Sequence, residues 1–299
     1  MTAAALNRVL GRWLAVLADD WLPAACVVCG SDRRGLHWAA TGLCEACAGA
    51  LPGAWARRCP RCGIGVGATS AAMATCAPAC DYPPPDWPEC DDCQADPPPF
   101  DCTIAAADYS PPLDRLLHAL KFGRDAALAR PLGGWLGLRL PASAAAAAGP
   151  PAGTASTPGV ASTPATPIAP IIPAPLVTAV PLAPQRLAER GFNQSLEIAR
   201  AMARQAGLPL APHLLRRPHS AAPAATLDAA ERRAALHDAF VAPQALTGRD
   251  VFVVDDVMTT GATLRAAASA LKRAGAAHVV NCVIARTPAA HVQRRSGPP

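Results

Sequence analysis

The sequence predicts an α/β fold with a mainly parallel sheet flanked by helices, preceded by a small cysteine-rich domain. Two observations support this prediction. Apolar runs of strand length alternate with helical patterns after Phe100, and this alternation is typical of a parallel sheet covered by helices. Eleven of the twelve cysteines lie between Cys26 and Cys102, in a stretch with many Gly and Pro residues and little periodicity. We therefore expect two domains in the 299 residues, with the sheet in the second.

An amphipathic helix is expected over residues 1–22, because six large apolar side chains there follow helical spacing. They are Leu6, Leu10, Trp13, Leu14, Leu17 and Trp21. The apolar run ends at Asp19, which makes it too short for the core of a signal peptide. No proline-free apolar stretch reaches the roughly 18 residues of a membrane span. The sequence thus predicts a cytoplasmic protein without membrane insertion, and its net charge of +5 permits a polyanionic partner without requiring one.

The elements of the second domain follow one another from Thr103 onward. Residues 141–175 interrupt them with a stretch of mainly Ala, Pro, Thr, Ser and Gly, which buries too little apolar area to fold and is expected to be a disordered insert. The predicted order is strand 103–108, helix 113–121, strand 176–180, helix 193–205, strand 251–254, helix 262–274 and strand 278–284. Ligands of such sheets bind beyond the carboxyl ends of the strands.

The cysteines come in closely spaced pairs, which in a reducing compartment are more often metal ligands than disulfides. Two CxxC pairs have the spacing of a zinc ribbon, and their four thiolates complete a tetrahedron: Cys26, Cys29, Cys44 and Cys47. A third pair, Cys59 and Cys62, opens a second set. Spacing alone favours Cys76 and Cys80 as its closure, and Cys90 with Cys93 is the alternative. Sites of this kind are structural, because four thiolates leave no position open for water.

The segment Val251 to Thr263, VFVVDDVMTTGAT, places two acids and a Thr/Gly loop between a strand and a helix. Amide groups at a helix N-terminus bind phosphate. Gly261 lets the backbone approach closely, and the carboxylates of Asp255 and Asp256 suit ribose hydroxyls or a divalent ion. The loop residues expected at the phosphate are Thr259, Thr260, Gly261, Ala262 and Thr263. Together these features predict a ribose 5-phosphate ligand.

This segment closely resembles the motif with which type I phosphoribosyltransferases bind 5-phosphoribosyl-1-pyrophosphate (PRPP). Four more blocks extend the resemblance to the ComF family over nearly the whole chain. They are Pro98–Asp101, Leu117–Asp125, Val180–Gln194 and Ala285–Thr287.

The ComF resemblance implies a double zinc ribbon over residues 23–97 and a phosphoribosyltransferase-like domain over residues 98–290. It favours Cys90 and Cys93 as the closure of the second zinc site. It also implies magnesium with PRPP, and it places the loop after the strand at residue 180 beside the pyrophosphate. That loop offers Arg186, Arg190, Asn193 and Gln194, while Lys121 either caps a helix or faces the site.

The chain departs from the family pattern between Arg216 and Phe240. Ala221, Ala224 and Ala235 stand where the family usually has a Thr, a Gln and an Asn, and alanine side chains cannot hydrogen-bond an acceptor substrate. Three functions stay open. One is a phosphoribosyltransferase with an unassigned acceptor. The second is a non-catalytic module of the DNA-uptake machinery that binds single-stranded DNA, with Arg57, Arg58 and Arg61 as candidate phosphate contacts. The third is a zinc-ribbon partner of a helicase of the uptake machinery, with a vestigial PRPP site.

Overall fold

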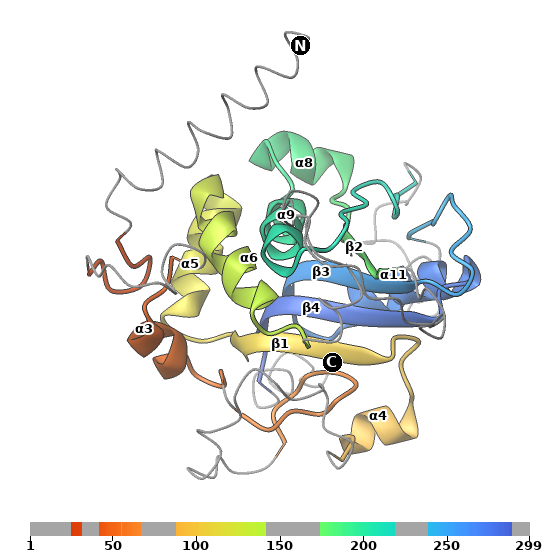
Figure 1. Ribbon diagram of the computed structural model, residues 1–299, viewed down its shortest axis with the longest axis horizontal. Coiled ribbons are helices and arrows are strands. Elements are labelled where there is room, and N and C mark those ends of the chain that lie inside the picture. Colours follow the sequence, from red (N-terminus) through yellow and green to blue (C-terminus); the bar gives the residue numbers. More distant parts are fainter. Residues whose placement is uncertain are drawn as a thin grey trace, which may run out of the picture.

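A four-stranded sheet with the order β1–β4–β3–β2 forms the centre of the computed structural model (Figure 1). The strands are β1 (Cys102–Asp108), β2 (Leu176–Ala179), β3 (Asp250–Met258) and β4 (His278–Arg286). Every neighbouring pair is parallel, which confirms the predicted fold class. The structure describes residues 25–31, 42–54, 56–66, 88–141, 174–218 and 239–288.

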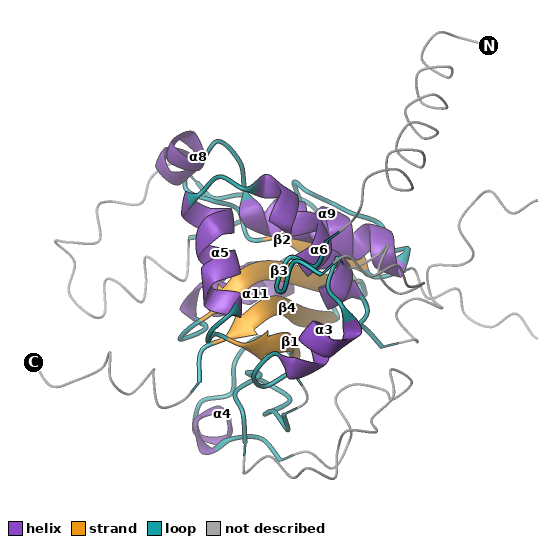
Figure 2. Ribbon diagram, turned by 90° about the vertical axis from the view of Figure 1, so that its left-hand side faces the viewer, coloured by secondary structure: helices purple, strands orange, loops and turns teal. Residues whose placement is uncertain are grey.

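Helices cover both faces of this sheet, as Figure 2 shows. The described helices are α3 (Glu45–Ala50), α4 (Asp91–Ala95), α5 (Leu113–Phe122), α6 (Ala129–Gly137), α8 (Pro184–Arg190), α9 (Gln194–Ala206) and α11 (Ala262–Arg273), with a short 3₁₀ helix, η2 (Ala126–Leu128). None of these helices is both long and apolar enough to cross a membrane.

Alternate residues of β3 enter two separate cores, because successive side chains of a strand point to opposite faces. Phe252 and Val254 pack with buried leucines and alanines of α5, α6 and α9. Val251 and Val253 pack with the apolar face of α11, including Leu264. The strand is therefore apolar on both sides, as a parallel sheet covered by helices requires.

Close packing between α6 and α9 explains a helix that the sequence analysis did not predict. The sequence of α6 contains three glycines, which lower helix propensity. A Cβ atom on Gly133 would lie 2.4 Å from the carbonyl oxygen of Ile198, and one on Gly137 would lie 2.8 Å from Cβ of Gln205. The glycines are needed where the two helices touch, so tertiary contact outweighs local propensity.

The two cysteine-rich segments contribute side chains to different cores. Leu43 and Leu51, which flank the pair Cys44 and Cys47, belong to the core under α5, α6 and α9. Cys62 of the second set and Phe100, which follows that segment, belong to the core under α11. The backbone between them is tied to the end of β1, where the N–H of Asp108 donates to the carbonyl oxygen of Pro52 over 2.8 Å.

Most predicted element bounds lie within a residue or two of those observed, and the largest difference is at β3. The strand was expected to end at Val254, but it continues to Met258 because Asp255, Val257 and Met258 still pair with β4. The N-terminal helix, most of the Ala/Pro-rich stretch, Cys76 and Cys80, and the three alanines near residue 230 lie outside the described residues.

Candidate functional site

The loop between β3 and α11 lies at the carboxyl edge of the sheet, where all four strands end. Gly261 adopts a φ of +82°, a left-handed conformation that glycine enters at little cost. Thr259, Thr260 and Thr263 are exposed around it. The first N–H groups of α11 have no acceptor within the helix, and the one at Ala262 has only a long contact of 3.4 Å to Thr260 Oγ1. The structure thus presents hydroxyls and helix-terminal amides together.

Asp255 and Asp256 lie directly before this loop, and each has a partner from a different helix. The hydroxyl of Ser195 in α9 donates to Asp255 Oδ1 over 2.8 Å. Lys121 Nζ in α5 lies 3.1 Å from Asp256 Oδ1. The second oxygen of Asp256 is buried and has no hydrogen-bond partner among the described residues. A buried carboxylate oxygen without a partner is costly, so this atom is suited to a ligand hydroxyl or a cation.

The pKa of Asp255 is raised to about 7, first because burial disfavours its charged form and second because Asp256 is next to it. The Ser195 hydroxyl and Lys121 act in the opposite direction. Part of the Asp255 population is therefore protonated at neutral pH in the unliganded protein. A bound cation would favour the ionised form.

The predicted pyrophosphate residues have different surroundings. Arg186 is exposed on α8, whereas the Arg190 guanidinium lies over the Phe122 ring, 5.3 Å from its centroid. Asn193 caps α9 by accepting from the N–H of Ser195 over 3.0 Å, and its Nδ2 donates to the carbonyl of Val180. Asn193 therefore has a structural task that accounts for both of its polar groups.

Two residues beside the site were not predicted to belong to it, although Arg286 lies in the resemblance block Ala285–Thr287. Ser195 directly follows Asn193 and Gln194, so its place in the first turn of α9 was the available signal. Arg286 ends the apolar strand β4 and is 5% exposed. A charge at the end of a buried strand needs partners, and this requirement could have identified it.

Arg286 finds its partners in backbone carbonyls from three segments. Its Nε donates to Cys62 O over 2.9 Å. Its Nη1 donates to Met258 O over 3.1 Å, to Thr287 O over 3.1 Å, and to Thr259 O. One guanidinium therefore links a cysteine-rich turn to the loop before α11.

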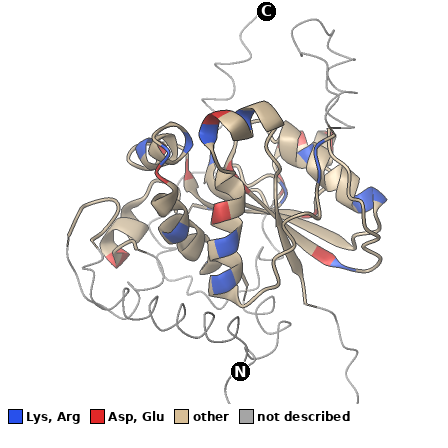
Figure 3. Cartoon of the chain, turned by 90° about the horizontal axis from the view of Figure 1, so that it is seen from above, with Lys and Arg blue, Asp and Glu red and all other residues tan. Residues whose placement is uncertain are grey.

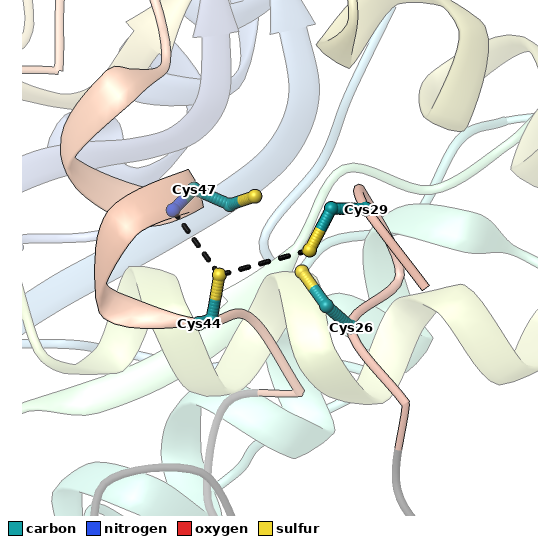
Figure 4. A group of neighbouring side chains, drawn as sticks. All are labelled: Cys26, Cys29, Cys44 and Cys47. Atoms are coloured by element: carbon teal, nitrogen blue, oxygen red, sulfur yellow. Dashed lines mark hydrogen bonds between the residues drawn. The ribbon is translucent and has the colours of Figure 1, made fainter. Parts of the chain in front are cut away.

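The first cysteine quartet gathers four thiols that point toward one another, as Figure 4 shows. It comprises Cys26, Cys29, Cys44 and Cys47, whose sulfurs all lie within 4.8 Å of one another. Zinc bound by four thiolates at about 2.3 Å would place its sulfurs about 3.8 Å apart. The Cys29 and Cys44 sulfurs are 3.9 Å apart, and all four thiols are free. The quartet therefore fits a structural zinc ion.

The second quartet has the same form and comprises Cys59, Cys62, Cys90 and Cys93. The sulfurs of Cys62 and Cys90 are 3.6 Å apart. The pKa of Cys59 is lowered to about 4, mainly by the side-chain hydrogen bond with Cys62, while burial raises the pKa of Cys93 to about 12. A thiolate favoured at neutral pH within a group of four sulfurs suits a cation.

One proposed nucleic-acid contact beside this quartet is wrong. Arg58 is 2% exposed, and its guanidinium bonds to Asp108 Oδ1 and to two backbone carbonyls. Arg61 pairs with Glu89 over 2.9 Å, which leaves Arg57 as the exposed member of the three. Arg58 is held inside because the end of β1 supplies a carboxylate to pair with it.

Comparison with known proteins supports a relationship over nearly the whole chain. Residues 193–298 match the family model described as a phosphoribosyl transferase domain. Proteins named DNA utilization protein YhgH are 30% identical over 266 residues in Salmonella typhi and in Escherichia coli K12. Each alignment covers 89% of this chain and 98% of the relative.

Proposed function

Because this chain belongs to the ComF family, whose members are phosphoribosyltransferase-like proteins with N-terminal zinc ribbons, we propose that it binds PRPP with magnesium at the β3–α11 loop. The observation that carries the proposal is the pairing of two acids with a helix N-terminus. Asp255 and Asp256 immediately precede an exposed Thr/Gly loop whose amides open α11. Acids suit ribose hydroxyls and helix-terminal amides suit a phosphate, and a ribose phosphate needs both kinds of group in one site.

In this proposal each part of PRPP has its own residues. The loop Thr259 to Thr263 holds the 5′-phosphate through backbone N–H groups and hydroxyls. Asp255 and Asp256 accept from the ribose hydroxyls. Arg186 and Arg190 lie on α8, after β2, and face the pyrophosphate, whose oxygens match the guanidinium fork.

Magnesium fits the same acids, because the buried free oxygen of Asp256 is a hard ligand of the kind the ion prefers. When bound, the ion neutralises charge on the pyrophosphate. Lys121 places a positive charge beside Asp256, since Lys121 Nζ lies 3.1 Å from Asp256 Oδ1.

The reaction proposed for this site is phosphoribosyl transfer. A nucleophile attacks the anomeric carbon of PRPP, the bond to the pyrophosphate oxygen breaks, and pyrophosphate leaves with the electron pair. The protein's share is positioning and charge stabilisation. The acceptor is not assigned, because Ala221, Ala224 and Ala235 lie outside the described residues and offer no hydrogen-bonding side chain.

Isothermal titration with PRPP and magnesium tests the binding site. We expect the zinc-loaded wild type to bind, and the double variant Asp255→Ala, Asp256→Ala to lose detectable binding. Asp250→Ala is the matched control, because Asp250 lies on the same strand at its opposite end and pairs with His278 over 2.8 Å. Equal affinity in the double variant and the wild type would overturn the site, and absence of binding by the wild type would overturn the proposal.

A second candidate function is a cytoplasmic module that binds single-stranded DNA beside an uptake helicase. The name of the relatives, DNA utilization protein, favours it. Figure 3 shows Lys and Arg on several helices with Asp and Glu among them. A DNA affinity that falls steeply with salt and weakens in Arg57→Ala would support this function, and salt-independent or undetectable binding would exclude it.

A further inference from the structure

Arg286 donates hydrogen bonds to two backbone carbonyls at the start of the loop proposed to hold the phosphate. Fixing the carbonyls of Met258 and Thr259 also fixes the peptide planes to which they belong. In a trans peptide the C=O and the following N–H point in opposite directions. With those carbonyls turned toward Arg286, the N–H groups of Thr259 and Thr260 are turned away from it. The Met258 carbonyl also accepts from the N–H of Thr287 over 3.0 Å. Arg286 therefore shares the orientation of the Thr259 amide with Thr287, and it orients the Thr260 amide through the Thr259 carbonyl.

The same guanidinium of Arg286 also contacts the second cysteine quartet. Its Nε donates to the carbonyl of Cys62, a residue whose sulfur lies 3.6 Å from that of Cys90. The position of that carbonyl depends on the tight turn between Cys59 and Cys62, and zinc would close this turn. The guanidinium is buried, so loss of the Cys62 carbonyl would leave one of its donors unpaired at appreciable cost.

A second connection leads from the same quartet to the first turn of α11. Arg265 Nη1 lies 3.1 Å from Asp96 Oδ2, and its Nη2 donates to Asp96 O over 3.0 Å. Asp96 is the residue that ends α4, which contains Cys93. The phosphate loop is thus held on both sides, by Arg286 before it and by Arg265 after it. Both contacts lead to the second quartet.

We propose that Arg286 is a positioning residue for the phosphate loop, and that zinc in the second quartet sets the affinity of the site for ribose phosphates. This inference rests on the proposed PRPP function. Zinc closes the Cys59–Cys62 turn, the turn holds the Cys62 carbonyl, and Arg286 transmits that position to the amides of the loop. Among the described residues, the first quartet makes no hydrogen bond to this loop, and it packs in the other core.

Arg58 supplies a closely matched control for testing Arg286. Both arginines are buried, at 2% and 5% exposure. Both donate to carbonyls of the same turn, since Arg58 Nη1 bonds to Gly63 O over 2.9 Å. The difference is that Arg58 pairs with Asp108 at the end of β1, whereas Arg286 reaches the phosphate loop. Their variants should lose similar stability and differ in ligand affinity.

The experiment measures PRPP affinity by titration, thermal midpoint and zinc content for Arg286→Ala, Arg286→Lys and Arg58→Ala. We expect both Arg286 variants to bind PRPP at least about tenfold more weakly, since charged hydrogen bonds to the loop are lost. Arg58→Ala should stay within about twofold of the wild type. Asp96→Ala, at an exposed carboxylate, gives a variant whose folding is not at risk and should weaken binding about threefold.

Equal affinities in wild type, Asp96→Ala and any folded Arg286 variant would overturn the inference while leaving the PRPP site intact. Equal weakening by Arg58→Ala and Arg286→Ala would also overturn it, because the effect would then reflect general loss of stability. A wild type that fails to bind PRPP would overturn the proposed function itself. The three outcomes are distinguishable in one set of titrations.

Discussion

The two cysteine quartets have the same ligands but different neighbours. In each, four sulfurs lie within 4.8 Å of one another. The first belongs to the core beneath α5, α6 and α9, where a Cβ on Gly42 would lie 2.7 Å from Pro131 of α6. The second belongs to the core beneath α11 and bonds to the phosphate loop through Arg286. If the proposed function holds, a repeated motif serves packing in one copy and supports a ligand site in the other.

The largest difference is expected when each quartet loses one pair of ligands. Cys26→Ser with Cys29→Ser, and Cys59→Ser with Cys62→Ser, should each reduce zinc from about two ions per chain to about one, because tight binding needs the full set of thiolates. Both double variants should be less stable. The second should also lose PRPP affinity by tenfold or more, and the first should keep it within about twofold.

Metal analysis and PRPP titration below the unfolding temperature check this prediction. Equal losses of affinity in the two double variants would remove the distinction between the quartets.

An intermediate effect is expected from the apolar residues beside each quartet. Leu51→Ala and Phe100→Ala remove buried side chains of the first and second core, and each should cost about 2–5 kcal/mol of unfolding free energy. Urea unfolding measures that cost. At low temperature only Phe100→Ala should weaken PRPP binding, because Phe100 packs in the core that contains Cys62. A stronger effect on binding from Leu51→Ala would contradict the comparison.

The smallest effect is expected at a surface ion pair within the second cysteine segment. Arg61 and Glu89 are each about one-third exposed, and such pairs contribute less than about 1 kcal/mol. Arg61→Ala should keep two zinc ions and leave PRPP affinity within about twofold, because the Arg61 side chain bonds to Glu89 and to the carbonyl of Phe100, and neither lies in the phosphate loop. Titration and metal analysis check this. Strong weakening would mean that nearness to the quartet, rather than the Arg286 contact, determines affinity.

Sequence analysis predicted most of the second domain because its strands are apolar on both faces and its phosphate loop carries a specific local pattern. It missed α6, whose glycines argue against a helix until the contact of Gly133 with α9 is known. It also proposed Arg58 as a surface cation. The partner that buries this arginine is Asp108, 50 residues further along the chain, and no local pattern reports such a pairing.

The same limit explains what could not be predicted of the site. Asp255 and Asp256 were predicted from their place before the loop, and Lys121 was left as either a helix cap or a residue facing the site. The pairing of Lys121 with Asp256, and the bond from Ser195 to Asp255, come from two other helices. Arg286 acts on a turn 224 residues away in sequence. Local chemistry is readable in a sequence, whereas contacts between distant segments depend on how the sheet is assembled.

The most direct test of the coupling between the second quartet and the phosphate loop is zinc release to a zinc-selective chelator, with and without magnesium–PRPP. The two double cysteine variants described above, each lacking one quartet, show which released zinc ion belongs to which quartet. Coupling free energies are reciprocal, so a quartet that raises PRPP affinity must bind zinc more tightly when PRPP is present. We predict that PRPP retains the zinc of Cys59, Cys62, Cys90 and Cys93 and leaves the other ion unaffected. Equal retention of both ions, or of neither, would contradict the coupling.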